Sequence, residues 1–265
     1  MTMARRSDAQ SIEIFHLLFL RVLAKGQANW FTLKGGANIR YFFGSPRYSN
    51  DIDLDFDGRA GWQVTKTVDS LLSGPALAML ARASNIELVE VSAAKQTETT
   101  LRWKIGLSVA QQHALVRTKI EFSGRGGGSD DVAFAVVPNE IVRPYALQAP
   151  TVRHYLETAA IDQKIAALAL RSETKARDIF DLELLLRQRR ATDAVLTDLE
   201  STHAAAAAGK ALSIPFASFT TEVAPFLDVA LADLYDEPVW EAMCLEVADD
   251  LTGVSAGATP PGPHA

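Results

Sequence analysis

The sequence predicts an α+β protein, in which a mixed-sheet lobe is followed by an all-helical lobe. Short segments with a two-residue apolar alternation recur up to about residue 137. A stretch marked by Pro138, Pro144 and Pro150 follows, and beyond it the apolar residues repeat with helical spacing to about residue 250. We therefore expect one domain at residues 1–145, a helical domain at 146–251 and a disordered tail at 252–265.

Composition and charge limit the class of protein. The chain has 265 residues, of which 48% are hydrophobic and 22% charged, enough for one large or two modest domains with a core. Its net charge of -6 argues against a protein that coats nucleic acid regardless of sequence. The single cysteine, Cys244, fits a reducing cytoplasm. We expect a soluble cytoplasmic protein without a membrane span.

The first lobe is expected to begin with a core-facing helix at residues 8–25 that Gly26 ends. A strand at 30–33, a turn at 34–36 and a helix at 37–43 follow. A further helix, with a possible interruption at 73–75, covers residues 63–84. The remaining segments alternate as strands, and we expect those after residue 85 to form an antiparallel meander added to the first two: residues 51–57, 86–92, 101–109, 115–123 and 132–137, with a glycine loop at 124–129.

The second lobe is expected to contain only helices. Each predicted helix follows the spacing of its apolar residues: residues 161–171, 174–190, 192–208, 218–235 and 237–251. No internal repeat links them.

Three aspartates mark the strand at residues 51–57. Asp51, Asp53 and Asp55 point one way and the apolar residues between them the other. Taken alone, the aspartates fit a solvated strand face equally well. If the strand at 115–123 pairs beside them, Glu121 approaches Asp51 and Asp53, and the three carboxylates form a hard-oxygen site that suits Mg²⁺. Asp55 is expected to be a bystander.

A glycine pair, Gly35-Gly36, stands where a strand meets a helix. Glycine lets the backbone approach a ligand closely, and the helix N-terminus offers free N–H groups and a positive dipole. These features predict a phosphate cradle. Phosphate, metal and carboxylates together indicate transfer of a nucleotidyl or phosphoryl group.

The ordered motifs resemble a known family. Gly35-Gly36, fourteen intervening residues and then Asp51-Ile52-Asp53-Leu54 resemble the signature of the polymerase-β-type nucleotidyltransferase fold, and Glu121 fits its third carboxylate. The longer stretch from residue 33 to residue 54 is similar to the AbiEii/AbiGii-type toxins of type IV toxin–antitoxin systems. In the helical lobe, the segment that begins at Lys164 and the segment around Asp178 resemble that family's downstream motifs. The resemblance covers about residues 31–186.

This resemblance implies a Mg²⁺-dependent enzyme that transfers NMP from an NTP to an acceptor hydroxyl. The acceptor would be tRNA or another RNA, growth arrest the outcome, and a cognate antitoxin protein the partner. The residues implied as catalytic are Asp51, Asp53, Glu121, Lys164 and Asp178, of which Asp51, Asp53 and Glu121 bind metal. The residues implied to bind the nucleotide are Lys34, Gly35, Gly36, Asn38, Arg40 and Ser49.

Several alternatives stay open. Arg40 can equally be a charge partner within the protein, and Lys164 can be a solvated helix residue. Lys164 and Asp178 face similarly only if one helix joins them without a break near Ser172. The acceptor can be a small molecule, such as an antibiotic, or the protein can be an inactive binding protein. If the acceptor is RNA, two basic patches are candidates: residues 187–190, and Arg102, Lys104, Arg117 and Lys119.

Overall fold

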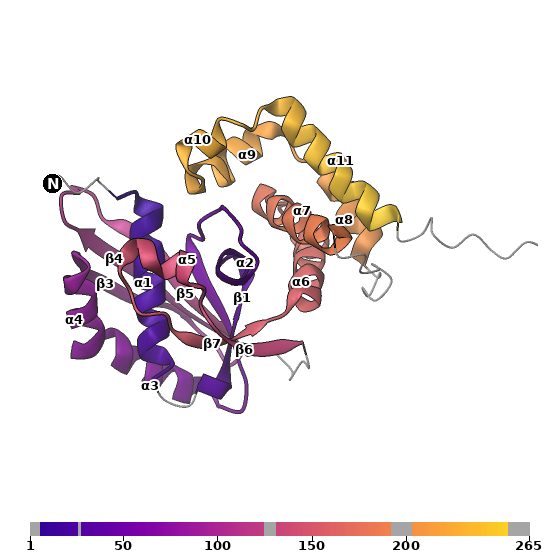
Figure 1. Ribbon diagram of the computed structural model, residues 1–265. Helices are drawn as coiled ribbons and strands as arrows, with labels where there is room; N and C mark the ends of the chain where they lie inside the picture. The colour runs from indigo at the N-terminus through magenta and orange to yellow at the C-terminus, as the bar shows by residue number, and fades with distance from the viewer. Residues whose placement is uncertain (1–5, 26–27, 125–130, 192–202, 254–265) are drawn as a thin grey trace, which may run out of the picture. The chain divides into compact units, whose positions relative to one another are not determined.

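The computed structural model describes residues 6–25, 28–124, 131–191 and 203–253 (Figure 1). The chain divides into two compact units, Met1–Leu156 and Glu157–Ala265. The first contains a mixed sheet with helices and the second contains helices, which confirms the predicted α+β class. The predicted domain limits remain a proposal about where independently folding parts begin and end.

A seven-stranded mixed sheet organises the first unit, in the order β3-β4-β5-β2-β1-β7-β6. β1 pairs antiparallel with β2 and parallel with β7, while β2 pairs parallel with β5. The outer pairs, β3 with β4, β4 with β5 and β6 with β7, are antiparallel. The strands are β1 Phe31–Lys34, β2 Asp51–Phe56, β3 Ile86–Gln96, β4 Thr100–Val109, β5 Val116–Ser123, β6 Val132–Val136 and β7 Thr151–Tyr155.

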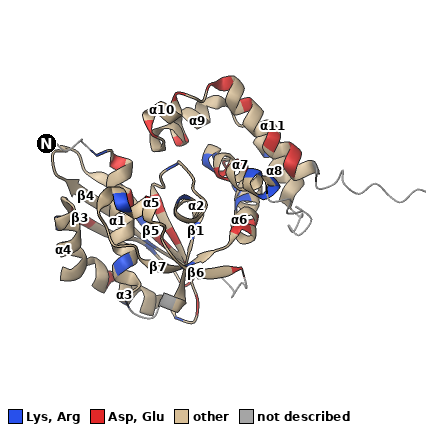
Figure 2. Cartoon of the chain, viewed as in Figure 1, with Lys and Arg blue, Asp and Glu red and all other residues tan. Residues whose placement is uncertain are grey.

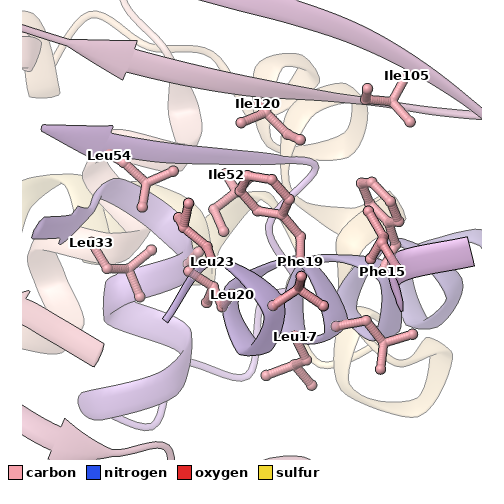
Figure 3. Close-up of a cluster of buried hydrophobic side chains, with 14 of the residues drawn as sticks. Phe15, Leu17, Phe19, Leu20, Leu23, Leu33, Ile52, Leu54, Ile105 and Ile120 are labelled. Atoms are coloured by element: carbon pink, nitrogen blue, oxygen red, sulfur yellow. The ribbon is translucent and has the colours of Figure 1, made fainter. Parts of the chain in front are cut away.

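Helix α1 (Asp8–Leu23) lies at the centre of the first unit's core. It begins where Ser7 and Gln10 form a reciprocal capping box, which satisfies two backbone N–H groups. Its apolar side chains pack against residues of the sheet (Figure 3). Two further helices complete this layer, α3 (Gly61–Leu72) and α4 (Pro75–Ala83). The break between them confirms the interruption predicted at 73–75, where Pro75 takes the first helical position.

The predicted meander is correct for β3, β4 and β5 and wrong for β6. β6 lies at the opposite edge of the sheet, where it pairs with β7, a strand that the sequence analysis did not predict. β7 has five residues and follows Pro150, with α5 (Asn139–Val142) and a short 3-10 turn before it. Its partner β1 lies more than a hundred residues earlier, and parallel pairing of this kind leaves no local turn signal.

The second unit is built from helices, as predicted. Residues Trp240 and Phe219 are fully buried in its core, and the indole Nε1 of Trp240 donates to the carbonyl of Ile214 at 3.1 Å. The helices are α6 Glu157–Leu170, α7 Ala176–Ala191, α8 Ala204–Ala211, α9 Phe216–Glu222, α10 Val229–Ala232 and α11 Glu237–Gly253.

The single helix predicted at 218–235 is wrong. A 3-10 turn, Ala224–Phe226, and the extended residue Asp228 separate α9 from α10. Pro225 within that turn has no N–H to donate to a helical carbonyl, which explains the break.

Three expectations lie wholly or partly outside the described residues: the glycine loop, the start of the helix at 192–208, and the tail. In the part of the chain that the structure describes, no helix has the length and apolarity needed to cross a membrane.

Candidate active site

The alternating aspartates of β2 lie on the polar face of the sheet. Asp51 is in register with Lys119 of β5, Asp53 with Glu121, and the residues between them face the apolar core. Figure 2 colours the acidic residues of these central strands red. The parallel pairing of β2 with β5 therefore brings Glu121 beside the aspartates, as the sequence analysis expected.

The first and third aspartates have cationic partners. Oδ2 of Asp51 forms an ion pair with Nζ of Lys119 at 2.8 Å, and the Asp51 side chain is only partly exposed. Asp55 is buried, contacts the Lys34 ammonium and accepts a hydrogen bond of 2.8 Å from the Tyr155 hydroxyl. Two partners hold the Asp55 carboxylate, and its place as a bystander stays a prediction.

Glu121 is held by the neighbouring strand on its other side. Its Oε2 accepts from Nε of Arg102 at 2.7 Å and lies 2.6 Å from another nitrogen of the same guanidinium. Arg102 belongs to β4 and is in register with Glu121. To act as a metal ligand or a base through Oε2, Glu121 must give up at least one of its two contacts with Arg102.

The glycine pair allows a close approach between three side chains and the backbone. Gly35 has φ +67°, and a Cβ there would lie 2.9 Å from Oδ2 of Asp53. A Cβ at Gly36 would lie 2.8 Å from Oγ of Ser49 and 2.9 Å from a guanidinium nitrogen of Arg47. These distances are too short for real Cβ contacts, so the two glycines leave room for these side chains at the start of α2 (Gly35–Phe42).

The other predicted nucleotide-binding residues are engaged within the protein. Arg40 donates from Nε to Glu13 of α1 at 2.8 Å. Asn38 is buried and donates to the carbonyl of Tyr155 at 3.0 Å. Ser49 donates from Oγ to the carbonyl of Asp51 at 2.8 Å. Their roles as nucleotide contacts stay predictions.

The helical unit contains a second cluster of charges. Lys164 of α6 lies 2.9 Å from Oδ1 of Asp178 and 2.7 Å from Oδ2 of Asp181, both on α7. Arg171 also pairs with Asp178. α6 ends at Leu170 and α7 begins at Ala176, so Lys164 and Asp178 meet across a helix hairpin rather than along one helix.

A protein-family model described as "Nucleotidyl transferase AbiEii toxin, Type IV TA system" matches residues 17–253. That match covers most of the chain. The chain belongs to the AbiEii family. It is therefore a nucleotidyltransferase of the toxin class, as the motifs predicted.

Solved structures agree on the fold of this AbiEii protein. JHP933 from Helicobacter pylori has 19% identity and a TM-score of 0.64, with 96% of this chain and 94% of that chain covered. A candidate nucleotidyltransferase from H. pylori has 19% identity and a TM-score of 0.64, with 98% and 100% covered. No curated protein matches.

The carboxylates of the AbiEii chain fit a magnesium ion in the mode that uses one or two protein carboxylates together with substrate phosphates. Asp51 and Asp53 are hard-oxygen donors at successive positions of one strand face, and the missing Cβ of Gly35 leaves open backbone beside Asp53. Within the described ranges, no group of three His, Cys, Asp or Glu side chains is arranged to hold a metal ion. The fit therefore rests on the aspartate pair.

Sequence reasoning missed the residues that β7 brings to this site. Tyr155 binds Asp55, and Arg153 donates to Oγ1 of Thr32 at 2.7 Å and pairs with Asp57. Burial, followed by the charge of Asp55, raises the pKa of the Tyr155 phenol, which keeps it protonated as a donor. The usable signal was a short run after a proline that contains the strand-favouring residues Thr151, Val152 and Tyr155, which indicates a strand but not its partner.

Proposed function

We propose that this AbiEii protein transfers a nucleoside monophosphate from a Mg²⁺-bound NTP to an acceptor hydroxyl, and that growth arrest follows. tRNA is the proposed acceptor. The observation that carries the proposal is the position of Asp53 directly against the Gly35 backbone, which joins a carboxylate to a helix N-terminus in one site.

The first unit supplies most of the proposed roles. When bound, Mg²⁺ would neutralise the charge that develops on the attacking and leaving oxygens. Asp51 and Asp53 would hold the ion, after Lys119 releases Asp51. The N–H groups at the start of α2 and the Lys34 ammonium would bind phosphates. Glu121 would assist the metal or accept the proton of the acceptor hydroxyl.

The helical unit contributes Lys164 and Asp178 to the proposed set. The family resemblance assigns Lys164 to phosphate charge and Asp178 to support of catalysis or placement of the acceptor. Their direct contact of 2.9 Å makes it natural to treat them as one functional group.

Membership of the family also leads us to expect particular binding partners and a particular cellular compartment. A type IV toxin has a cognate antitoxin and uses an NTP. We propose the cytoplasm as its compartment, in keeping with a single unpaired cysteine, Cys244. The net charge of -6 favours one rival, a small-molecule acceptor, because polyanionic RNA is repelled by an acidic protein.

The deciding experiment is to incubate the purified full-length protein with each NTP, labelled at the α-phosphate, and total RNA, with and without Mg²⁺. We expect label in RNA from at least one NTP and only when Mg²⁺ is present. Label in small molecules alone would replace the RNA acceptor with the rival. No transfer to either would leave a nucleotide-binding protein and contradict the proposal.

A further inference from the structure

We propose that the polar face of β3, β4 and β5 binds the sugar-phosphate backbone of the acceptor RNA through Lys95 and Lys104. The inference rests on the proposed function, because it names the surface on which that enzyme would hold its acceptor. The surface lies wholly within the first unit, and its two lysines have no part in the site described above.

The strand register sets cations opposite one another on this face. Lys104 of β4 is in register with Lys119 of β5, and Lys95 of β3 is in register with Arg102 of β4. Residues directly opposite each other in an antiparallel pair have Cβ atoms about 5 Å apart, and like charges there destabilise the sheet. The fold therefore gains nothing from these two pairs, which indicates that they serve a ligand of opposite charge. We call Lys95 and Lys104, the members farther from β2, the outer lysines.

In each pair, the inner cation has a carboxylate partner and the outer lysine has none. Lys119 pairs with Asp51 at 2.8 Å, and a guanidinium nitrogen of Arg102 lies 2.6 Å from Glu121. The outer lysines are both exposed, and no carboxylate among the residues that the structure describes forms an ion pair with either of them. The two ammonium groups therefore keep their positive charge for a ligand.

A third cation of the face is neutralised by an acid that crosses β4. Arg117 of β5 pairs with Glu90 of β3 at 2.7 Å. The carboxylate passes over Gly106 of β4, where a Cβ would lie 3.1 Å from Oε2 of Glu90. The sheet thus provides an acid for Arg117, and even leaves room for it, but provides none for the outer lysines.

The position of the outer lysines points to the acceptor rather than to the NTP. The proposed phosphate cradle, at Lys34 and the start of α2, lies on the β1 side of β2, whereas β5, β4 and β3 lie on the other side. Lys104 is in line with Asp51 two strands away, which places it about 10 Å from the proposed metal site. An RNA whose hydroxyl reaches Asp51 and Asp53 would place its neighbouring phosphates over this distance.

The side chains of the face suit phosphates and not bases. Proteins that bind single-stranded nucleic acid through its bases stack them on aromatic side chains. The aromatic residues of β4 and β5, Trp103 and Phe122, are fully buried in the core, and the described residues of β3 include no aromatic side chain. Binding to this face should therefore depend strongly on salt and little on the RNA sequence.

The test measures RNA binding by the full-length protein in the absence of NTP. The probes are total tRNA and an unrelated short RNA, titrated at NaCl concentrations from about 50 to about 300 mM, and the Tm of each variant is measured alongside. The variants are Lys95→Gln/Lys104→Gln and Lys95→Arg/Lys104→Arg. Lys66→Gln is the matched control. Lys66 is an exposed lysine of α3, which packs on the other face of the sheet, and it has no carboxylate partner among the described residues.

We expect the double glutamine variant to raise the Kd for both RNAs by roughly 10- to 100-fold at the lowest salt concentration, because two phosphate contacts are lost. The slope of log Kd against log salt should fall by about 0.7 to 0.9 for each lysine. The Tm should stay the same or rise, since two like-charge pairs disappear. The double arginine variant keeps both charges and should bind like wild type, and Lys66→Gln should change neither the Kd nor the slope.

Wild-type affinity and slope in the double glutamine variant would overturn the inference. An equal loss of affinity in Lys66→Gln, or in the double arginine variant, would also overturn it, because charge at this face would not be the cause. A wild-type protein that binds polyglutamate through the outer lysines, and binds no RNA, would assign the face to an acidic protein instead. RNA binding through the outer lysines without label transfer from any NTP would contradict the proposed function and still support this inference.

Discussion

The two charge clusters of the protein use the same residue types in opposite ways. On β2 and β5, each acid with a known cationic partner has its own: Lys119 for Asp51, Lys34 for Asp55 and Arg102 for Glu121. In the helical unit, two acids share Lys164. The first arrangement is partly exposed and the second is closed to solvent.

This difference indicates that the burial of an ion pair decides whether it can take part in catalysis or only stabilise the fold. A partly exposed ion pair is worth little to stability, so its partners can change when a substrate or metal arrives. A buried cation with two carboxylates is costly to break, because each charge left alone has no water to replace its partner. We therefore expect substitutions in the first cluster to change activity with little loss of stability, and those at the buried residues of the second cluster to lower stability as well.

The largest effect should follow Asp53→Asn. If Asp53 holds the metal, nucleotide transfer should fall by on the order of 10³-fold or more. The Tm of the variant is measured alongside, so that a loss of transfer is not mistaken for unfolding. Asp57→Asn is the matched control, as Asp57 follows the same strand and pairs with Arg153. Near-normal transfer in Asp53→Asn would remove it from the metal site.

Asp181→Asn tests the second cluster in the same way. Asp181 is fully buried and bound to Lys164, so we expect the free energy of unfolding to fall by about 3 kcal/mol. Chemical denaturation measures this. A change below about 0.5 kcal/mol is the range of ordinary surface substitutions. It would show that the cluster of Lys164 and its two carboxylates does not stabilise the fold, and that the two clusters do not differ in this respect.

Gly35→Ala should weaken the first cluster through the backbone. Alanine at φ +67° is strained, and its Cβ would press on Asp53 Oδ2, so we expect a loss of about 1 to 2 kcal/mol together with reduced transfer. Gly44→Ala separates the two causes, because Gly44 has φ +68° and nothing within 4 Å of a Cβ. If both variants lose transfer equally, the close approach to Asp53 has no special role.

A smaller effect concerns a buried histidine of α1 that contacts β5. His16 Nε2 lies 2.8 Å from Oγ1 of Thr118, whose hydroxyl donates to the carbonyl of Asn50 at 2.7 Å. Burial lowers the pKa of His16 to about 3, whereas the imidazole in an unfolded chain titrates near 6.5. Between these values the unfolded chain binds more protons, so the free energy of unfolding falls as the pH decreases.

His16→Gln should remove this part of the slope, up to about 1.4 kcal/mol for each pH unit below 6.5. Denaturant unfolding of wild type and variant between pH 4.5 and 7 measures the difference. His113→Gln, at an exposed histidine, is the control and should leave the slope unchanged. Parallel curves for wild type and His16→Gln would mean that His16 is not held neutral in the fold.

Local patterns allowed the central part of the fold and site to be predicted. The alternation at 51–57 and 115–123 is a property of each strand alone, so it placed Asp53 and Glu121 on one polar face. The cationic partners depend on neighbouring strands. Arg102 became visible as the partner of Glu121 only once β4 paired with β5 in a known register.

The missed part of the site depends on distant pairing. Tyr155 reaches Asp55 because β7 lies beside β1, and five residues after a proline carry no sign of that position. Lys164 and Asp178 are a related case. Their spacing suggested a common helix face, but a hairpin between two helices brings them together, which only the packing of α6 on α7 determines.

The pairing of Leu33 with His154 also sets the order of events during synthesis. A ribosome adds roughly 5 to 20 residues each second, so the 121 positions from 33 to 154 take about 6 to 24 s to appear. Until then β1 has no partner on that side, and Asp55 has no tyrosine to donate to it. The nascent chain therefore carries Gly35-Gly36 and the aspartates of β2 well before β7 completes the sheet around them. Translation itself therefore delays the moment at which Asp55 and its tyrosine partner can meet.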